Sequence, residues 1–181
     1  MRDKIRRFGW LALAVLFVVT GVGFGIYAFL VNTHPSSNSD IISCAKASNP
    51  PNQQPGKNGK VIGAQLADFK SPAKISFIYC TDYKVGTGAE VTSSNQTVEV
   101  NYVGALASNG TIFDSSFDNG QPVSFQLTQV ITGWSFGLHG MKVGGVRRIF
   151  IPAQYGYGST AISSIPANSD LVFDVQLLSV K

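Results

Sequence analysis

The hydrophobic residues of this chain fall into two regions with different patterns. Near the N-terminus, the segment from Phe8 to Val31 is a run of 24 residues without a charge. As an α-helix it would extend for about 36 Å at roughly 1.5 Å per residue, which is longer than the ~30 Å hydrocarbon core of a bilayer. The pattern predicts a transmembrane helix over residues 8–31, with the lipid bilayer as its partner.

The charges that precede this run predict its orientation. Residues 1–7 carry four cations and one anion, and an excess of positive charge keeps a flank cytoplasmic. We therefore expect a basic cytoplasmic segment at 1–7 and an extracytoplasmic remainder, in a single-pass membrane protein. Gly21 and Gly25 have the small-xxx-small spacing of membrane helices that approach closely, so a weak helix-mediated dimer is a further expectation.

Two alternatives to an uncleaved anchor remain open. A cleavable signal peptide also starts with a basic flank, although its apolar region usually has about 7–15 residues and ends at a small-residue cleavage site. The tetrapeptide Ile41-Ile42-Ser43-Cys44 loosely resembles a lipoprotein processing box, but polar residues separate it from the apolar run.

Residues 32–65 have the composition of a linker. They are rich in Pro, Ser, Asn, Gln and Gly and contain few residues that could build a core. We expect a flexible extracytoplasmic tether over 32–65 that holds a folded domain away from the membrane.

From Lys74 onward, short runs rich in Val, Ile, Phe, Tyr and Thr alternate with turns that contain Gly and Asn, as in β-strands. Val98, Val100 and Tyr102 alternate with polar residues, so one face of that strand is expected to be buried. The predicted strands are 75–79 with 83–85, 97–105, 123–127, 146–151 and 171–180, and the one predicted helix is 132–138. These elements predict an α+β fold in which an antiparallel sheet curls around the helix.

Net charge gives no support to a nucleic-acid partner. The chain has a formal charge of +4, with 14 Lys and Arg against 10 Asp and Glu. Without residues 1–7, ten cations remain against nine anions, a balance of +1 that leaves no basic face. Arg147 and Arg148 fall inside a strand-like run, where we interpret them as solvated side chains or side chains packed along their stems.

Conventional catalytic groups are nearly absent from the sequence. The two histidines, His34 and His139, are far apart, and there is no nucleophile elbow, phosphate-binding loop or metal-ligand cluster. We therefore expect no metal and no cofactor. Cys44 and Cys80 fall in the exported part, where an intramolecular disulfide is favoured over free or intermolecular thiols; it would contribute about 3–4 kcal/mol in the chain-entropy model.

Eight short segments carry the strongest functional signal. They are VGTGA at 85–89, VNYVG at 100–104, GTIFDSS at 110–116, QVITGW at 129–134, GLHGMKVG at 137–144, YGYG at 155–158, IPAN at 165–168 and LVFDVQLL at 171–178. In sequence and in order they resemble the FKBP family of peptidyl-prolyl cis/trans isomerases. The resemblance covers residues 66–181 and implies a five- to six-stranded antiparallel half-barrel wrapped around one short helix.

The resemblance also implies an aromatic pocket between helix and sheet that binds Pro-containing polypeptides. Trp134 corresponds to its floor, Asp114 to its carboxylate, and Tyr157 and the N–H of Ile131 to donors that hold substrate carbonyls. Ile165 corresponds to a residue of the overhanging loop. The remaining residues of the expected pocket are Tyr102, Phe113, Val123, Phe125, Val130 and Phe173.

Some positions depart from the family pattern. Val123 stands where an aromatic residue is frequent, Ala167 replaces a proline, and the loop 159–164 lacks the usual glycines. The expected function is that of a membrane-tethered prolyl isomerase acting on exported chains. A module that binds Pro-containing segments with little turnover is the first alternative, and an anchored structural or adhesion domain with an aromatic core is the second.

Overall fold

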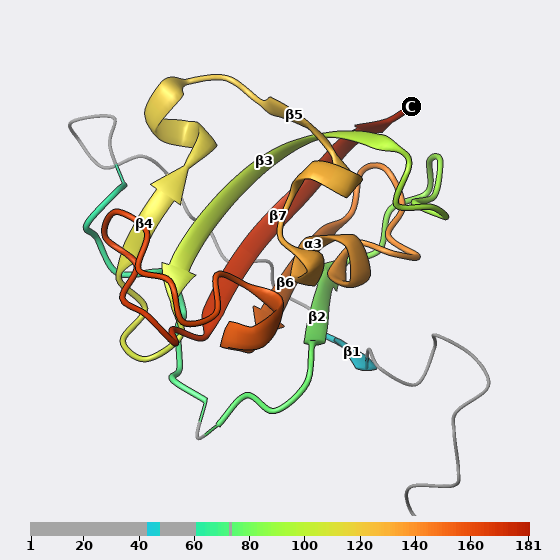
Figure 1. Ribbon diagram of the computed structural model, residues 1–181. Coiled ribbons are helices and arrows are strands. Elements are labelled where there is room, and N and C mark those ends of the chain that lie inside the picture. The colour runs from blue at the N-terminus through green and yellow to red at the C-terminus, as the bar shows by residue number, and fades with distance from the viewer. Residues whose placement is uncertain (1–42, 48–60, 73) are drawn as a thin grey trace, which may run out of the picture. The chain divides into compact units, whose positions relative to one another are not determined.

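The computed structural model describes residues 43–47, 61–72 and 74–181, and its main element is a curved sheet of seven strands (Figure 1). Six strands follow the order β1-β2-β6-β7-β3-β4, and β5 pairs with β3 beyond this path. The strands are β1 (Ser43–Lys46), β2 (Tyr79–Lys84), β3 (Thr97–Leu106), β4 (Ile112–Ser115), β5 (Val123–Gln126), β6 (Val146–Ile151) and β7 (Leu171–Val180).

The long strands β3 and β7 form the centre of this sheet. They pair antiparallel from Val98↔Val180 to Leu106↔Leu171. Val98, Val100 and Tyr102 of β3 are buried, which confirms the face that the alternation predicted. In β7 the first five residues are all buried, because this strand is covered on both faces.

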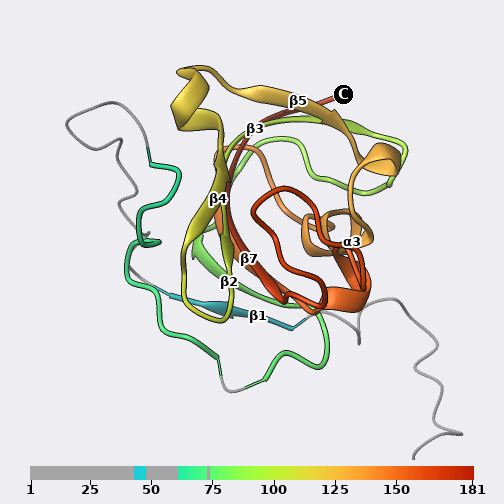
Figure 2. The same cartoon turned by 60° about the vertical axis from the view of Figure 1, so that its left-hand side comes forward.

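Helix α3 (Thr132–Gly137) lies against the concave side of the sheet (Figure 2). Its two glycines, Gly133 and Gly137, let the helix backbone approach β6 closely. A Cβ atom at Gly137 would lie 2.5 Å from Cγ2 of Ile149, and one at Gly133 would meet Ile151 in the same way. Since any larger residue would push the helix away, these glycines set its distance from the sheet.

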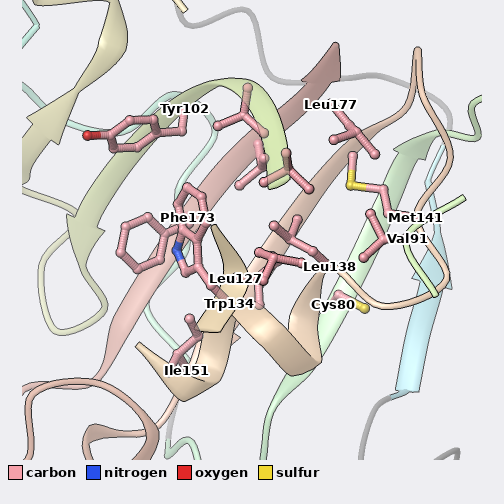
Figure 3. Close-up of a cluster of buried hydrophobic side chains, with 14 of the residues drawn as sticks. Cys80, Val91, Tyr102, Leu127, Trp134, Leu138, Met141, Ile151, Phe173 and Leu177 are labelled. Carbon is pink, nitrogen blue, oxygen red and sulfur yellow. The ribbon is translucent and has the colours of Figure 1, made fainter. Parts of the chain in front are cut away.

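The main core fills the space between α3 and the concave face. It contains Trp134 and Leu138 from the helix segment, Ile149 and Ile151 from β6, and Phe173 from β7. Figure 3 shows Trp134 and Phe173 at one end of this cluster and Met141 and Leu177 at the other. Trp134 and Phe173 therefore belong both to this core and to the site described below.

The opposite face of the sheet is covered by residues 61–72. Val61 and Leu66 are buried against a second cluster that includes Ile112 and Val172. The N–H of Gly63 donates to the carbonyl of Ile112 at 2.8 Å. The domain thus includes residues 61–65, which the sequence assigned to the tether. Residues more than 40 positions later in the sequence, such as Ile112, hold this segment against the sheet.

The adjacent arginines of β6 are buried, which corrects the expectation of solvated or stem-packed side chains. Arg147 and Arg148 are 5% and 3% exposed. Each makes a bidentate ion pair, Arg147 with Asp82 of β2 and Arg148 with Asp174 of β7. Pairing of this kind is what allows a strand to bury two cations.

The first strand makes the sheet mixed rather than purely antiparallel, and it brings the strand number above the expected five to six. β1 pairs with β2 in parallel, with Cys44 opposite Cys80. A disulfide joins these two cysteines, which is the intramolecular pairing among the alternatives that the sequence left open. β1 therefore also falls inside the range expected to be tether.

The expected segments at 1–7 and 8–31 lie outside the described residues. Within 43–47, 61–72 and 74–181, no helix is long and apolar enough to cross a membrane.

Candidate active site

A cavity of about 290 Å³ opens between α3, β3, β5 and β7. Two of its residues, Val130 and Ile131, precede the helix, and Tyr157 belongs to the long loop between β6 and β7. The lining consists of Tyr102, Asp114, Phe125, Gln129, Val130, Ile131, Trp134, Tyr157 and Phe173. Elements far apart in the sequence thus converge on one mainly apolar cleft.

A larger depression of about 570 Å³ lies beside Gly158, between residues 74–76 and 152–159. It contains none of the residues expected in the pocket, and its lining includes Lys74, Gln154 and Asp170. The smaller cavity is the candidate site because the aromatic residues and the polar groups at the rim meet there.

Trp134 is the centre of the cavity's aromatic wall. It is 4% exposed, and its ring lies edge-to-face with Tyr102, Phe125 and Phe173 at centroid distances of 5.4, 5.3 and 5.4 Å. Figure 3 shows Trp134, Tyr102 and Phe173 on the same side of the buried cluster. Edge-to-face pairs each stabilise by about 0.5–1.5 kcal/mol beyond burial, so the indole is held as a fixed apolar surface.

Phe113 packs against Phe173 of this wall and does not line the cavity itself. Its ring lies edge-to-face with Phe173 at 5.7 Å. Both rings occupy the space above Gly104, where a Cβ atom would lie 2.6 Å from Phe173 and 2.9 Å from Phe113. The glycine in the segment VNYVG is therefore required for the two phenylalanines to meet over β3.

One carboxylate and two phenols form the polar part of the cavity. The hydroxyl of Tyr102 donates to Oδ2 of Asp114 at 2.6 Å, and Oδ1 of Asp114 accepts from the N–H of Ser115 at 2.8 Å. Burial first, and then the hydrogen bond to Asp114, raise the pKa of Tyr102 above its ordinary value. Burial and the charge of Asp114 also raise the pKa of Tyr157. Both phenols are therefore protonated at neutral pH.

Two hydrogen-bond donors at the cavity have capacity for a ligand. Tyr157 is 37% exposed. The N–H of Ile131, which immediately precedes α3, takes part in no hydrogen bond found among the described residues. Unpaired N–H groups are expected at a helix N-terminus, and here the cavity is next to one.

Besides Phe113, two residues expected in the pocket lie outside its lining. Val123 is half-buried and packs against the main core. Ile165, expected to overhang the cavity, is buried at 5% exposure, because residues 162–165 form a tight reversal with backbone bonds between Ile162 and Ile165. Within this turn Ile162 is the large hydrophobic residue that is exposed, at 41%.

Gln129 lines the cavity but was not among the expected site residues. It begins the segment QVITGW, whose next two residues were expected there. Its position could have been inferred from that adjacency, although the sequence gives no direct sign of which way its side chain points.

Comparison with known families assigns residues 88–178 to the family described as FKBP-type peptidyl-prolyl cis-trans isomerase. The match covers 91 of the 181 residues, half of the chain. This chain belongs to that family.

Named relatives agree with this assignment. The chain is 42% identical over 125 residues to the FKBP-type peptidyl-prolyl cis-trans isomerase FkpA of Buchnera aphidicola, covering 68% of this chain and 49% of the relative. It is 47% identical over 130 residues to FkpA of Aeromonas hydrophila, covering 72% and 47%. The chain thus spans about half the length of these curated relatives.

Solved structures show the same fold. The crystal structure of FkpA from Escherichia coli is similar with a TM-score of 0.55 and 40% identity, covering 63% of this chain and 53% of that one. The crystal structure of AtFKBP13 is similar with a TM-score of 0.52 and 33% identity, covering 57% and 93%. The mixed seven-stranded sheet with one short helix is consistent with this family's fold.

Proposed function

We propose that this protein accelerates cis/trans isomerisation of X-Pro bonds in polypeptide substrates. The observation that carries the proposal is the aromatic cavity around Trp134, in which an almost fully buried indole is held edge-to-face by three other rings. Family membership supports the same activity.

The cavity suits the electronic change that occurs during rotation. A peptide bond is planar because of amide resonance, and rotation about it has a barrier of about 18–20 kcal/mol. At the twisted midpoint this resonance is lost and the carbonyl becomes less polar. An apolar wall therefore favours the twisted amide over the planar one, and a site that binds the transition state more tightly than the ground state lowers the barrier.

Polar groups at the rim hold the atoms that must stay fixed. The N–H of Ile131 and the hydroxyl of Tyr157 donate to carbonyls on either side of the rotating bond, so rotation is confined to that bond. Asp114 accepts from the hydroxyl of Tyr102 and orients that ring. In this mechanism no proton is transferred and no covalent intermediate forms.

The proposed location is the extracytoplasmic side of a membrane, with residues 8–31 as the anchor and the N-terminus in the cytoplasm. Support comes from the uncharged run, from the basic residues before it, and from a disulfide of the kind that persists in oxidising compartments. The substrates would then be exported chains, and Gly21 and Gly25 would allow weak association of anchors.

Protease added outside sealed cells should digest the domain; full protection would contradict this topology.

An isomerase assay on the full chain tests the activity. With a Leu-Pro peptide, the protein should accelerate isomerisation, and the double variant Phe113→Ala/Trp134→Ala should lose most of that acceleration. Peptide binding without acceleration would instead indicate a module that holds Pro-containing segments. A fully active double variant would disprove the assignment of the pocket.

A further inference from the structure

Strand β6 presents three alternate side chains to helix α3: Arg147, Ile149 and Ile151. The two isoleucines contact the glycines of the helix, as described above. Arg147 lies on the same face of the strand by its period-two spacing, and it is nearly fully buried. The helix therefore rests on two apolar residues and one cation.

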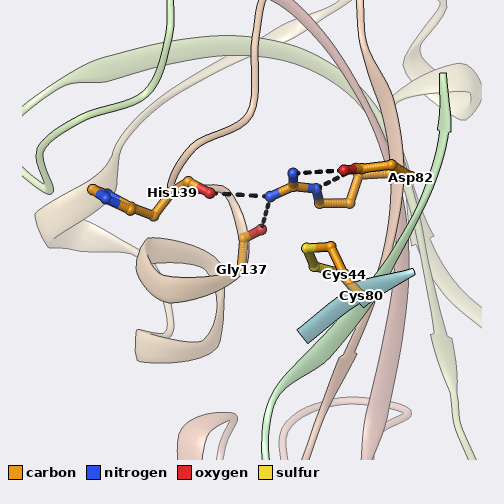
Figure 4. The surroundings of a disulfide bond; sticks show 6 residues. Cys44, Cys80, Asp82, Gly137 and His139 are labelled. Atoms are coloured by element: carbon orange, nitrogen blue, oxygen red, sulfur yellow. Dashed lines mark hydrogen bonds and ion pairs between the residues drawn. A yellow bond between two sulfur atoms is a disulfide. The ribbon is translucent and has the colours of Figure 1, made fainter. Parts of the chain in front are cut away.

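The guanidinium of Arg147 binds the C-terminal end of α3. Its Nη1 donates to the carbonyl of Gly137 at 2.8 Å and to that of His139 at 3.1 Å. Its Nε and Nη2 donate to the two carboxylate oxygens of Asp82 at 2.6 and 3.0 Å. Figure 4 shows these bonds converging between Gly137, His139 and Asp82. One side chain thus joins β2 and β6 to the end of the helix.

Helix α3 depends on such support more than a longer helix would. It has six residues, and its N-terminal end has no side-chain cap. Isolated helices of this length are unstable in water, and the last carbonyls of any helix need partners outside it. Arg147 supplies a partner for the carbonyl of the last helical residue, Gly137, and for that of His139, two residues beyond it. Its charge is also favourable at a helix C-terminus.

We infer that Arg147 is a positioning residue for Trp134, and this role rests on the proposed isomerase function. Trp134 is three residues before Gly137, and its carbonyl accepts from the N–H of Leu138 at 2.9 Å. The carbonyl of Gly137 is fixed by Arg147, so the turn that bears the indole is fixed at its end. Among the described residues, the hydrogen bonds of Arg147 go to Asp82, Gly137 and His139, none of which lines the cavity, so it acts through the helix.

The neighbouring Arg148 offers a matched control. It is equally buried and makes the same bidentate ion pair, with Asp174 at 2.6 and 2.8 Å. Its other bonds go to the carbonyls of Ala67 and Asp68, on the opposite face of the sheet. Replacing either arginine disrupts a buried ion pair. Only the replacement of Arg147 also removes the hydrogen bonds to the C-terminal end of α3.

The experiment compares Arg147→Lys with Arg148→Lys in the full chain, with Arg147→Met as a second variant. Lysine keeps the charge but cannot make the forked set of bonds. Activity is measured as kcat and KM on a Leu-Pro peptide. The position of the indole is measured by 19F NMR of 5-fluorotryptophan, in a Trp10→Phe background that leaves Trp134 as the one tryptophan.

Arg147→Lys should lower kcat about 10- to 100-fold, the range expected for a displacement near 1 Å, with a much smaller change in KM. It should also shift the 19F resonance of Trp134. Arg148→Lys should leave both readouts close to those of the unchanged chain. Arg147→Met should resemble Arg147→Lys or exceed it; if Arg147→Met does not fold, the lysine variants decide the question.

Equal losses of activity in the two lysine variants would overturn the inference, as would an unshifted Trp134 resonance in Arg147→Lys. If the unchanged chain fails to accelerate isomerisation, the proposed function falls, and the 19F comparison alone still decides whether Arg147 positions Trp134.

Discussion

The disulfide between Cys44 and Cys80 allows a quantitative prediction. The two cysteines are 36 residues apart in the sequence. In the chain-entropy model a closed loop of this length reduces the entropy of the unfolded chain enough to stabilise the folded domain by about 4 kcal/mol at 25 °C. Replacing Cys44 with alanine opens the loop and leaves Cys80, which is 1% exposed, as a buried thiol in the core.

The assay is chemical unfolding of the full chain in detergent, followed by near-UV circular dichroism. Cys44→Ala should lower the free energy of unfolding by about 3–4 kcal/mol, and the unchanged chain under reducing conditions should match it. Isomerase activity of the folded variant should persist, because neither cysteine lines the cavity. A loss below about 1 kcal/mol would refute the reasoning, since loop closure would then contribute little.

Three further predictions concern the site and its support. Tyr102→Phe should lower stability by about 1.5–3 kcal/mol, measured by urea unfolding, because it removes a hydrogen bond to the Asp114 carboxylate. Gly137→Ala should cost about 1–3 kcal/mol and reduce kcat, because its Cβ would lie 2.5 Å from Ile149. The pKa values of Tyr102 and Tyr157 are raised in the folded state, so the native protein keeps protons that the unfolded chain loses near pH 10. Their contribution to stability should be complete below pH ~10 and decline above it, as unfolding at graded pH would show.

The strands that the sequence predicted best are those that carry their own burial pattern. β6 and β7 have the expected bounds, and β3 extends one residue beyond them. In each, enough apolar residues recur within the strand to mark a buried face. The helix was also expected within one residue, because Gly140 marks the end of the segment.

The missed elements depend on partners elsewhere in the chain. β1 has four residues with no apolar alternation, and it lies beside β2 through the disulfide and the strand pairing. Residues 61–65, with the sequence VIGAQ, are too few to show a periodic pattern, yet Asp118 accepts from the N–H of Val61 at 2.6 Å and thereby fixes that segment. Composition alone cannot reveal such partners.

The residues of the site also divide into those that the sequence predicted and those whose positions depend on distant partners. The aromatic residues were expected from the order of the segments, and eight of the eleven expected residues line the cavity. Ile165 does not line the cavity, because a tight turn in the loop buries it and exposes Ile162 instead. The burial of Arg147 was also not predictable, since its partners are a carboxylate in β2 and the end of a helix.

The central claim is that an apolar wall, rather than a proton donor, lowers the barrier to rotation, and Trp134→Leu against Trp134→Gln tests it most directly. The two replacements are similar in size and differ in polarity. Exchange NMR of a Leu-Pro peptide should show that Trp134→Leu keeps more acceleration than Trp134→Gln, by a factor of about 10 or more, since an unpaired polar group in such a site costs about 1–3 kcal/mol. Equal acceleration in the two variants, or more in Trp134→Gln, would contradict the account.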